Sequence, residues 1–207
     1  VLKKICFSYV CHNINYINHN MFVQTEPTPN PLTLKFLPGR VVMQNGTAFF
    51  QNKSEVENSP LAKKFFEIDG VDGVFFGSDF ITITKKEELD WQIIKPPIFE
   101  IITEHFNSDN PVILTQTNSD KSEIEKNENE SDVIKQIKEL INTKVRPAVA
   151  MDGGDIVYQK FEEGVVYLHM QGACSGCPSS TATLKMGIEN MLKHYIPEVK
   201  EVRPVSA

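Results

Sequence analysis

A run of acidic and amide residues in the middle of this 207-residue chain constrains its fold more than any other feature. Residues 108–130 are mostly Asn, Ser, Asp, Glu and Lys, with almost no apolar side chains after Leu114. Such a segment buries too little apolar surface to offset the entropy that it would lose on ordering. We therefore expect a flexible acidic linker that joins two small domains, residues 21–107 and residues 131–207.

Apolar patterning predicts a small sheet with helices in the first of these domains. Residues 32–36 alternate as on a strand, and residues 73–84 have the composition of a strand hairpin. Ser59 followed by Pro60 is a favourable helix start. A second helical pattern covers residues 89–106, and its Pro96-Pro97 pair should kink or break it.

The second domain shows the same mixture of helices and strands. Ser131 is a suitable N-cap for an amphipathic helix, which should end at Arg146-Pro147 because the residue before proline disfavours helical geometry. A tight turn, two strands, a helix and a last strand are expected at 152–155, 156–161, 165–171, 178–197 and 199–205. The fold class is therefore α+β, with a small, mostly antiparallel sheet packed against helices in each domain.

Charge and hydropathy exclude several classes of partner and location. The net charge is −6, without the basic cluster that nucleic-acid binding requires, and no apolar run is long enough to span a membrane. Residues 1–20 lack Arg and a small-residue cleavage site, which disfavours a mitochondrial transit peptide and a secretory signal. We expect a bacterial cytoplasmic protein that starts at Met21, with residues 1–20 a non-native or disordered extension.

The candidate site is a cysteine pair at the junction between a predicted strand and a predicted helix. Cys174 and Cys177 are spaced C-x-x-C, which lets both sulfurs reach one metal centre. Pro178 suits the first helical position, so free backbone N–H groups should lie beside the cysteines and favour the thiolate form that binds metal. The other two cysteines, Cys6 and Cys11, lie in the N-terminal extension.

The number of ligands determines how such a site can be completed. An iron-sulfur cluster or a structural zinc takes four ligands, whereas Cys174 and Cys177 supply two. Two chains that share one cluster would complete the site and could release the cluster on parting. Three alternatives stay open: a thiol-disulfide oxidoreductase, a structural zinc site shared by a dimer, and an interaction adaptor without metal.

Other polar residues are weaker candidates for chemistry. His169 should point away from the core, so we expect it to be exposed or next to the ligands rather than a ligand itself. Asp152 and Asp155 are explained by the turn that Asp-Gly-Gly-Asp forms. His105, near a helix end, is expected to be a surface or capping residue, and Tyr158 and Lys185 have no partners at a catalytic spacing.

The C-terminal motifs resemble the NifU family. The resemblance rests on Asp152-Gly153-Gly154-Asp155, on the run from Gln171 through Cys174 and Cys177 to Ser180, and on Gly187-Ile188-Glu189. Residues 21–107 are similar to the N-terminal domain of Nfu-type proteins, with the entry sequence TEPTPNP.

This resemblance implies a scaffold or carrier protein rather than an enzyme. It implies that Cys174 and Cys177 bind a labile 4Fe-4S cluster between the two subunits of a homodimer. The cluster would come from upstream cluster-assembly proteins and would be delivered to apo-proteins.

Overall fold

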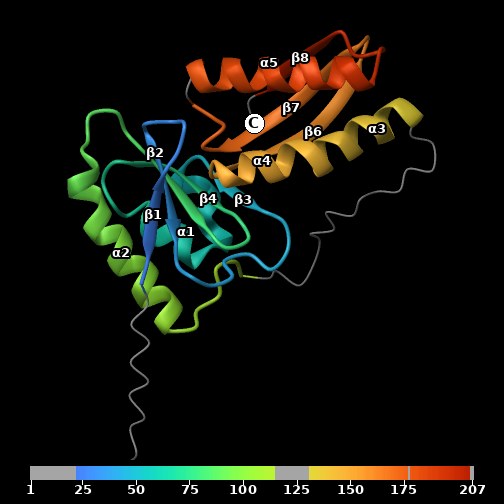
Figure 1. The fold of residues 1–207 in the computed structure, drawn as a ribbon. Helices are drawn as coiled ribbons and strands as arrows, with labels where there is room; N and C mark the ends of the chain where they lie inside the picture. The colour runs from blue at the N-terminus through green and yellow to red at the C-terminus, as the bar shows by residue number, and fades with distance from the viewer. Residues whose placement is uncertain (1–21, 115–130, 177, 206–207) are drawn as a thin grey trace, which may run out of the picture.

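The computed structural model describes residues 22–114, 131–176 and 178–205, which form two α+β domains (Figure 1). The predicted fold class is confirmed, because each domain packs helices against one sheet. The N-terminal extension and most of the predicted linker lie outside the described residues.

The N-terminal domain is an antiparallel sheet in the strand order β1-β2-β5-β4-β3. Its strands are β1 (Gln24–Pro27), β2 (Thr33–Leu37), β3 (Ala48–Phe50), β4 (Val71–Phe76) and β5 (Ile81–Lys85). Its helices are η1 (Lys53–Asn58), α1 (Pro60–Phe65) and α2 (Trp91–Asn107). The predicted helix start at Ser59 and the β4–β5 hairpin are confirmed, whereas β1 and β3 were not predicted as strands.

Helix α2 runs through both of its prolines (Figure 1). The predicted break at Pro96-Pro97 is wrong, although these residues remove two backbone donors from the helix. Apolar side chains fix the helix on the sheet on both sides of the prolines, since Ile94, Ile98 and Ile102 are fully buried in the domain core. Tertiary packing outweighs the local cost of the prolines.

The central strands of this sheet are buried on both faces. Val74 and Phe76 of β4 point into the core formed with the helices, whereas Phe75 is equally buried outside that core. On β5, Thr82 is buried on the same side as Phe75, because the two residues are paired across the strands. Another part of the chain must therefore bury the second face of the sheet.

That part is the C-terminal domain, a sheet of three strands in the order β6-β7-β8 whose β7 lies against β4 and β5 (Figure 1). The strands are β6 (Gly154–Glu162), β7 (Val165–Gly172) and β8 (Glu201–Val205). Strands β6 and β7 are antiparallel, and β8 joins β7 in parallel. The helices are α3 (Asp132–Leu140), η2 (Ile141–Val145), α4 (Arg146–Met151) and α5 (Pro178–Tyr195).

The helical stretch that begins after Ser131 does not end at Arg146-Pro147. It widens into the π-helical turn η2, where the Arg146 N–H bonds to the carbonyl of Ile141, and it continues as α4 to Met151. Pro147 lies just after the π-helical turn, and the chain stays helical although this residue cannot donate a backbone N–H. The predicted end of this helix is therefore wrong.

The N-terminal domain holds the chain as far as Leu114. Val112 and Ile113 pack against its core, and the Leu114 N–H donates to the carbonyl of Asn58. Residues 115–130 lie outside the described residues. Among the helices that the structure describes, none combines the length and the hydropathy needed to cross a membrane.

Candidate metal centre at the cysteine loop

Cys174 lies in the loop that joins β7 to α5, as the sequence predicts. Hydrogen bonds within the loop close it: the N–H groups of Cys174 and Ser175 donate to the carbonyls of Gln171 and Gly172. The Thr181 hydroxyl of α5 donates to the Cys174 carbonyl at 3.2 Å and ties the loop to the helix. Cys177 lies outside the described residues.

The Cys174 thiol is enclosed, with only 5% of the residue exposed. Burial raises its pKa to about 12, and the nearby carboxylates of Asp152 and Asp155 act in the same direction. The sequence predicts a thiolate stabilised by the start of α5. In this conformation the desolvation of Cys174 instead favours the protonated thiol. The sequence did not show that this side chain is buried.

Gly154 provides the space for this thiol. A Cβ atom at position 154 would lie 2.5 Å from Cys174 Sγ and 2.7 Å from the Gln171 carbonyl oxygen. The Asp-Gly-Gly-Asp turn is therefore one wall of the cysteine loop. The sequence predicted the turn but not its contact with Cys174.

The two aspartates of this turn have different environments. Asp152 is exposed, whereas Asp155 is buried and accepts two hydrogen bonds of 2.7 Å from the guanidinium of Arg146. Asp155 also accepts from the Ile156 N–H at 2.8 Å, and its hydrogen bonds raise the pKa of Arg146. Asp155 thus joins α4 to β6, a structural role. Sequence reasoning treated Arg146 only as the end of a helix.

Polar side chains of the N-terminal domain form hydrogen bonds with the Asp-Gly-Gly-Asp turn and with the cysteine loop. Thr82 donates to the Gly153 carbonyl at 2.8 Å and Lys35 Nζ to the Met151 carbonyl at 3.1 Å. Asn30 Nδ2 donates to the carbonyl of Ser175 at 3.0 Å, and the Thr47 hydroxyl donates to Asp155 Oδ2 at 3.0 Å. Sequence reasoning assigned no role to these four side chains.

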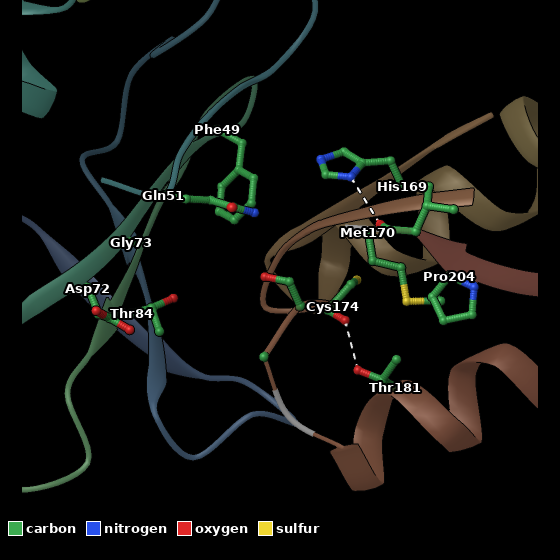
Figure 2. A pocket seen from close by; sticks show the side chains of 13 residues that line it. Phe49, Gln51, Asp72, Gly73, Thr84, His169, Met170, Cys174, Thr181 and Pro204 are labelled. Carbon is green, nitrogen blue, oxygen red and sulfur yellow. Dashed lines mark hydrogen bonds between the residues drawn. The ribbon is translucent and has the colours of Figure 1, made fainter. Parts of the chain in front are cut away.

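A cleft of about 470 Å³ lies between the domains beside Cys174 (Figure 2). Its N-terminal wall includes Gln51, Asp72 and Thr84, and its opposite wall includes Cys174 and Thr181. Side chains from both domains therefore surround the space next to the thiol. Among the described residues, no three His, Cys, Asp or Glu side chains are grouped so that they could hold a metal ion.

His169 also lines this cleft, and it is buried rather than exposed. Its ring lies 6.4 Å from that of Phe49 in the N-terminal domain, and its Nδ1 is 3.3 Å from the Val205 carbonyl. Its side chain points away from the core of its own domain, as predicted, but the N-terminal domain covers it. Figure 2 shows His169 and Phe49 on opposite walls.

The remaining candidates lie away from the cysteine loop. His105 is fully buried in α2, and within the part of the chain that the structure describes neither of its ring nitrogens has a hydrogen-bond partner. The predicted surface or capping position is therefore wrong, because the C-terminal end of α2 packs into the core. Tyr158 packs against the core of the C-terminal domain, and Lys185 lies 3.8 Å from Glu201 as an ion pair.

Comparison with known proteins relates both domains to described families. The "Scaffold protein Nfu/NifU N terminal" model matches residues 23–109, and the "NifU-like domain" model matches residues 137–203. The chain is 47% identical over 195 residues to the human "NFU1 iron-sulfur cluster scaffold homolog, mitochondrial", covering 94% of this chain and 74% of that protein. It is 50% identical over 184 residues to "NifU-like protein 5, mitochondrial" of Arabidopsis thaliana, covering 88% and 67%.

A Drosophila sechellia protein with the same printed name as the human one is 50% identical over 188 residues, covering 90% of this chain and 65% of that protein. The chain thus spans about two thirds or more of the length of each of these relatives. The prediction of a bacterial cytoplasmic location is wrong, because these plant, human and fly relatives are all named as mitochondrial. That prediction used the composition of 20 residues only, which carries less weight than identity at about half of the aligned positions.

Proposed function

This chain belongs to the Nfu/NifU family, and on that premise we propose that it carries an iron-sulfur cluster as cargo, with Cys174 and Cys177 as the protein ligands. The role is that of a scaffold or carrier, not of an enzyme. A mitochondrial location agrees with the names of its relatives.

The position of Cys174 is the observation that carries this proposal. Its thiol lies beside a cleft, at the junction where β7 ends and the sequence leads through Cys177 into α5. Thiolate sulfur is the ligand that iron-sulfur clusters take, and the C-x-x-C spacing allows two sulfurs to reach one cluster. Because the thiol is buried, binding requires the loop to open and the proton to leave.

We propose further that two chains share one 4Fe-4S cluster. Such a cluster takes four thiolates in its usual form, and each C-terminal domain has only Cys174 and Cys177. A cluster held between subunits can leave when they part, which suits delivery. The recipients would be apo iron-sulfur proteins, and upstream cluster-assembly proteins would supply the cluster.

Anaerobic reconstitution with iron and sulfide tests the ligands. The wild-type chain should become brown, with about one cluster per two chains and a shift to the size of a dimer. Cys174→Ser and Cys177→Ser should each abolish colour and dimer, whereas the matched controls Cys6→Ser and Cys11→Ser should retain both. Colour that survives Cys174→Ser, or a product that binds zinc but never iron and sulfide, would contradict the proposal.

Transfer tests the carrier role separately. The reconstituted protein, mixed with an apo form of a 4Fe-4S enzyme and then removed, should restore that enzyme's activity. The same mixture with a chelator that captures free iron should give the same recovery. Recovery that the chelator abolishes would show release of iron into solution instead of delivery of a cluster.

A further inference from the structure

We propose that the N-terminal domain docks reversibly on the cysteine loop and has to move away before two chains can share a cluster. The docking surface consists of the outward-facing side chains of the N-terminal sheet and its entry turn: Asn30, Lys35, Phe75 and Thr82. Its partner is the pair of loops around Gly153 and Ser175 in the same chain. The consequence for cluster sharing rests on the function proposed above, whereas the docking itself does not.

The contacts converge on the backbone of the two loops. The Gly153 carbonyl accepts from the Thr82 hydroxyl at 2.8 Å and from the Ala173 N–H at 3.1 Å, so one oxygen joins the sheet, the turn and the cysteine loop. Asn30 reaches the carbonyl of Ser175, the residue next to Cys174. The N-terminal domain thus bonds directly to the segment that would hold the cluster.

Glycines at two positions fit the docked arrangement. A Cβ atom at Gly153 would lie 3.0 Å from Thr82 Oγ1, and one at Gly172 would lie 2.9 Å from the Phe75 ring. Both glycines also have positive φ angles, of 82° and 60°. The absence of a side chain at Gly153 and Gly172 therefore permits both the backbone conformation of the loops and the close approach of the N-terminal domain.

The docking surface has the character of a separable interface. The two hydrophobic cores share no residue, because one contains only residues before 115 and the other only residues after 130. Between them lie polar side chains such as Lys35 and Thr82 together with the aromatic ring of Phe75, and all three residues are buried in the docked state. Interfaces of this kind between domains of one chain commonly open and close.

Docking and cluster sharing compete for the same space. The cleft beside Cys174 is walled on its far side by Gln51, Asp72 and Thr84 of the same chain. A second chain that contributes two thiolates to a common cluster has to bring its own cysteine loop to Cys174. The docked N-terminal domain walls the cleft through which that loop would have to come, so on this proposal the docked chain is a closed form.

Charge reversal on the docking surface tests the closed form in the full apo chain. Lys35→Glu removes the donor to the Met151 carbonyl, and Lys63→Glu makes the same charge change on the exposed surface of α1. We expect amide hydrogen exchange at residues 152–155 and 172–176 to accelerate about tenfold in Lys35→Glu and to stay unchanged in Lys63→Glu. A tenfold acceleration corresponds to docking that is about 1.4 kcal/mol less stable.

Thr82→Val is a second, milder variant that keeps the β-branched shape while it removes the hydroxyl bonded to Gly153. It should accelerate exchange in the same segments without lowering the melting temperature of the N-terminal domain. Unchanged exchange in both folded variants would overturn the docking.

Cluster loading then tests the consequence. Under reconstitution, Lys35→Glu and Thr82→Val should form the coloured dimer several-fold faster than the wild type, and Lys63→Glu at the wild-type rate. Equal rates in all four proteins would overturn the competition. If the wild type takes up no cluster, the proposed function fails, while the exchange experiment still decides whether the domains dock.

Discussion

The packing around Gly154 leaves no room for a side chain next to the cysteine loop. Any side chain at this position meets Cys174 Sγ and the backbone of Gln171, neither of which can move far. Gly187 on α5 is the opposite case, since a Cβ atom there would have no neighbour within 4 Å among the described residues outside the backbone of its own helix. The two positions are a matched pair for mutagenesis, because close contacts require glycine at position 154 and do not require it at position 187.

We predict that Gly154→Ala destabilises the C-terminal domain by about 1–3 kcal/mol, the cost of overpacking, and that it reduces cluster uptake because Cys174 is displaced. Gly187→Ala should be neutral or stabilising by up to about 1 kcal/mol, because alanine favours a helix. Thermal unfolding followed by circular dichroism measures the first effect, and visible absorbance after reconstitution measures the second. Equal stability of the two variants would contradict the geometry at Gly154.

His105 makes the stability of the N-terminal domain dependent on pH. Burial lowers the pKa of its ring, and the positive charge of Lys64 acts in the same direction. The unfolded chain takes up a proton near pH 6.5, whereas the folded domain resists it down to a lower pH. Stability is therefore complete above about pH 6.5 and is lost as the pH falls through the folded value.

We predict that His105→Leu removes this dependence on pH. It should also raise the stability at neutral pH by about 1 kcal/mol, because two ring nitrogens without a hydrogen-bond partner among the described residues leave the core. His194→Leu, at an exposed position, should keep the acid sensitivity of the wild type. Melting temperatures measured at about pH 7 and about pH 5 check both variants. An equal fall in melting temperature between these pH values in His105→Leu and in the wild type would show that His105 does not cause the acid sensitivity.

At the scale of elements, the start of α1 illustrates a cap that also serves the tertiary structure. Ser59 Oγ accepts from the Ala62 N–H at 3.1 Å and donates to the Val112 carbonyl at 2.7 Å, and the residue is fully buried. The cap itself is readable from Ser59-Pro60, whereas the bond to a residue 53 positions later is not.

We predict that Ser59→Ala costs about 1–2 kcal/mol of N-terminal domain stability, since the cap is lost and the partly buried carbonyl of Val112 loses its donor. Ser131→Ala removes the cap of α3 at an exposed position, where the hydrogen bond to the Ile134 N–H is long at 3.4 Å. That variant should cost less than about 1 kcal/mol and should affect only the C-terminal domain. Denaturant titrations of both variants measure the difference, and equal losses would contradict the role of Val112.

Elements were predicted best where a local signal coincides with burial. The α1 start and the β4–β5 hairpin have both a turn or cap signal and an apolar pattern. The errors in the predicted helix ends fall at prolines: α2 continues through Pro96-Pro97, and α4 begins with Arg146-Pro147. In each case packing of the helix on a sheet outweighs a local preference of the backbone.

For the whole molecule, the two separate cores lead to a prediction about fragments. Residues 22–114 and residues 131–205 should each fold alone, because no core residue of one domain belongs to the core of the other. Amide NMR spectra of each fragment should be dispersed and should match the full chain except at the docking surface. A collapsed spectrum for either fragment would show that its core depends on the other domain.

The sequence by itself determined the division into two α+β domains, most helix starts and the position of Cys174 between a strand and a helix, because these features depend on local composition and periodicity. Only the tertiary structure decided that Asp155 pairs with Arg146, that His105 and His169 are buried, and that the N-terminal sheet lies on the cysteine loop. These facts depend on which surfaces meet across long stretches of chain. A periodic pattern indicates that a face is buried, but it does not specify what covers that face.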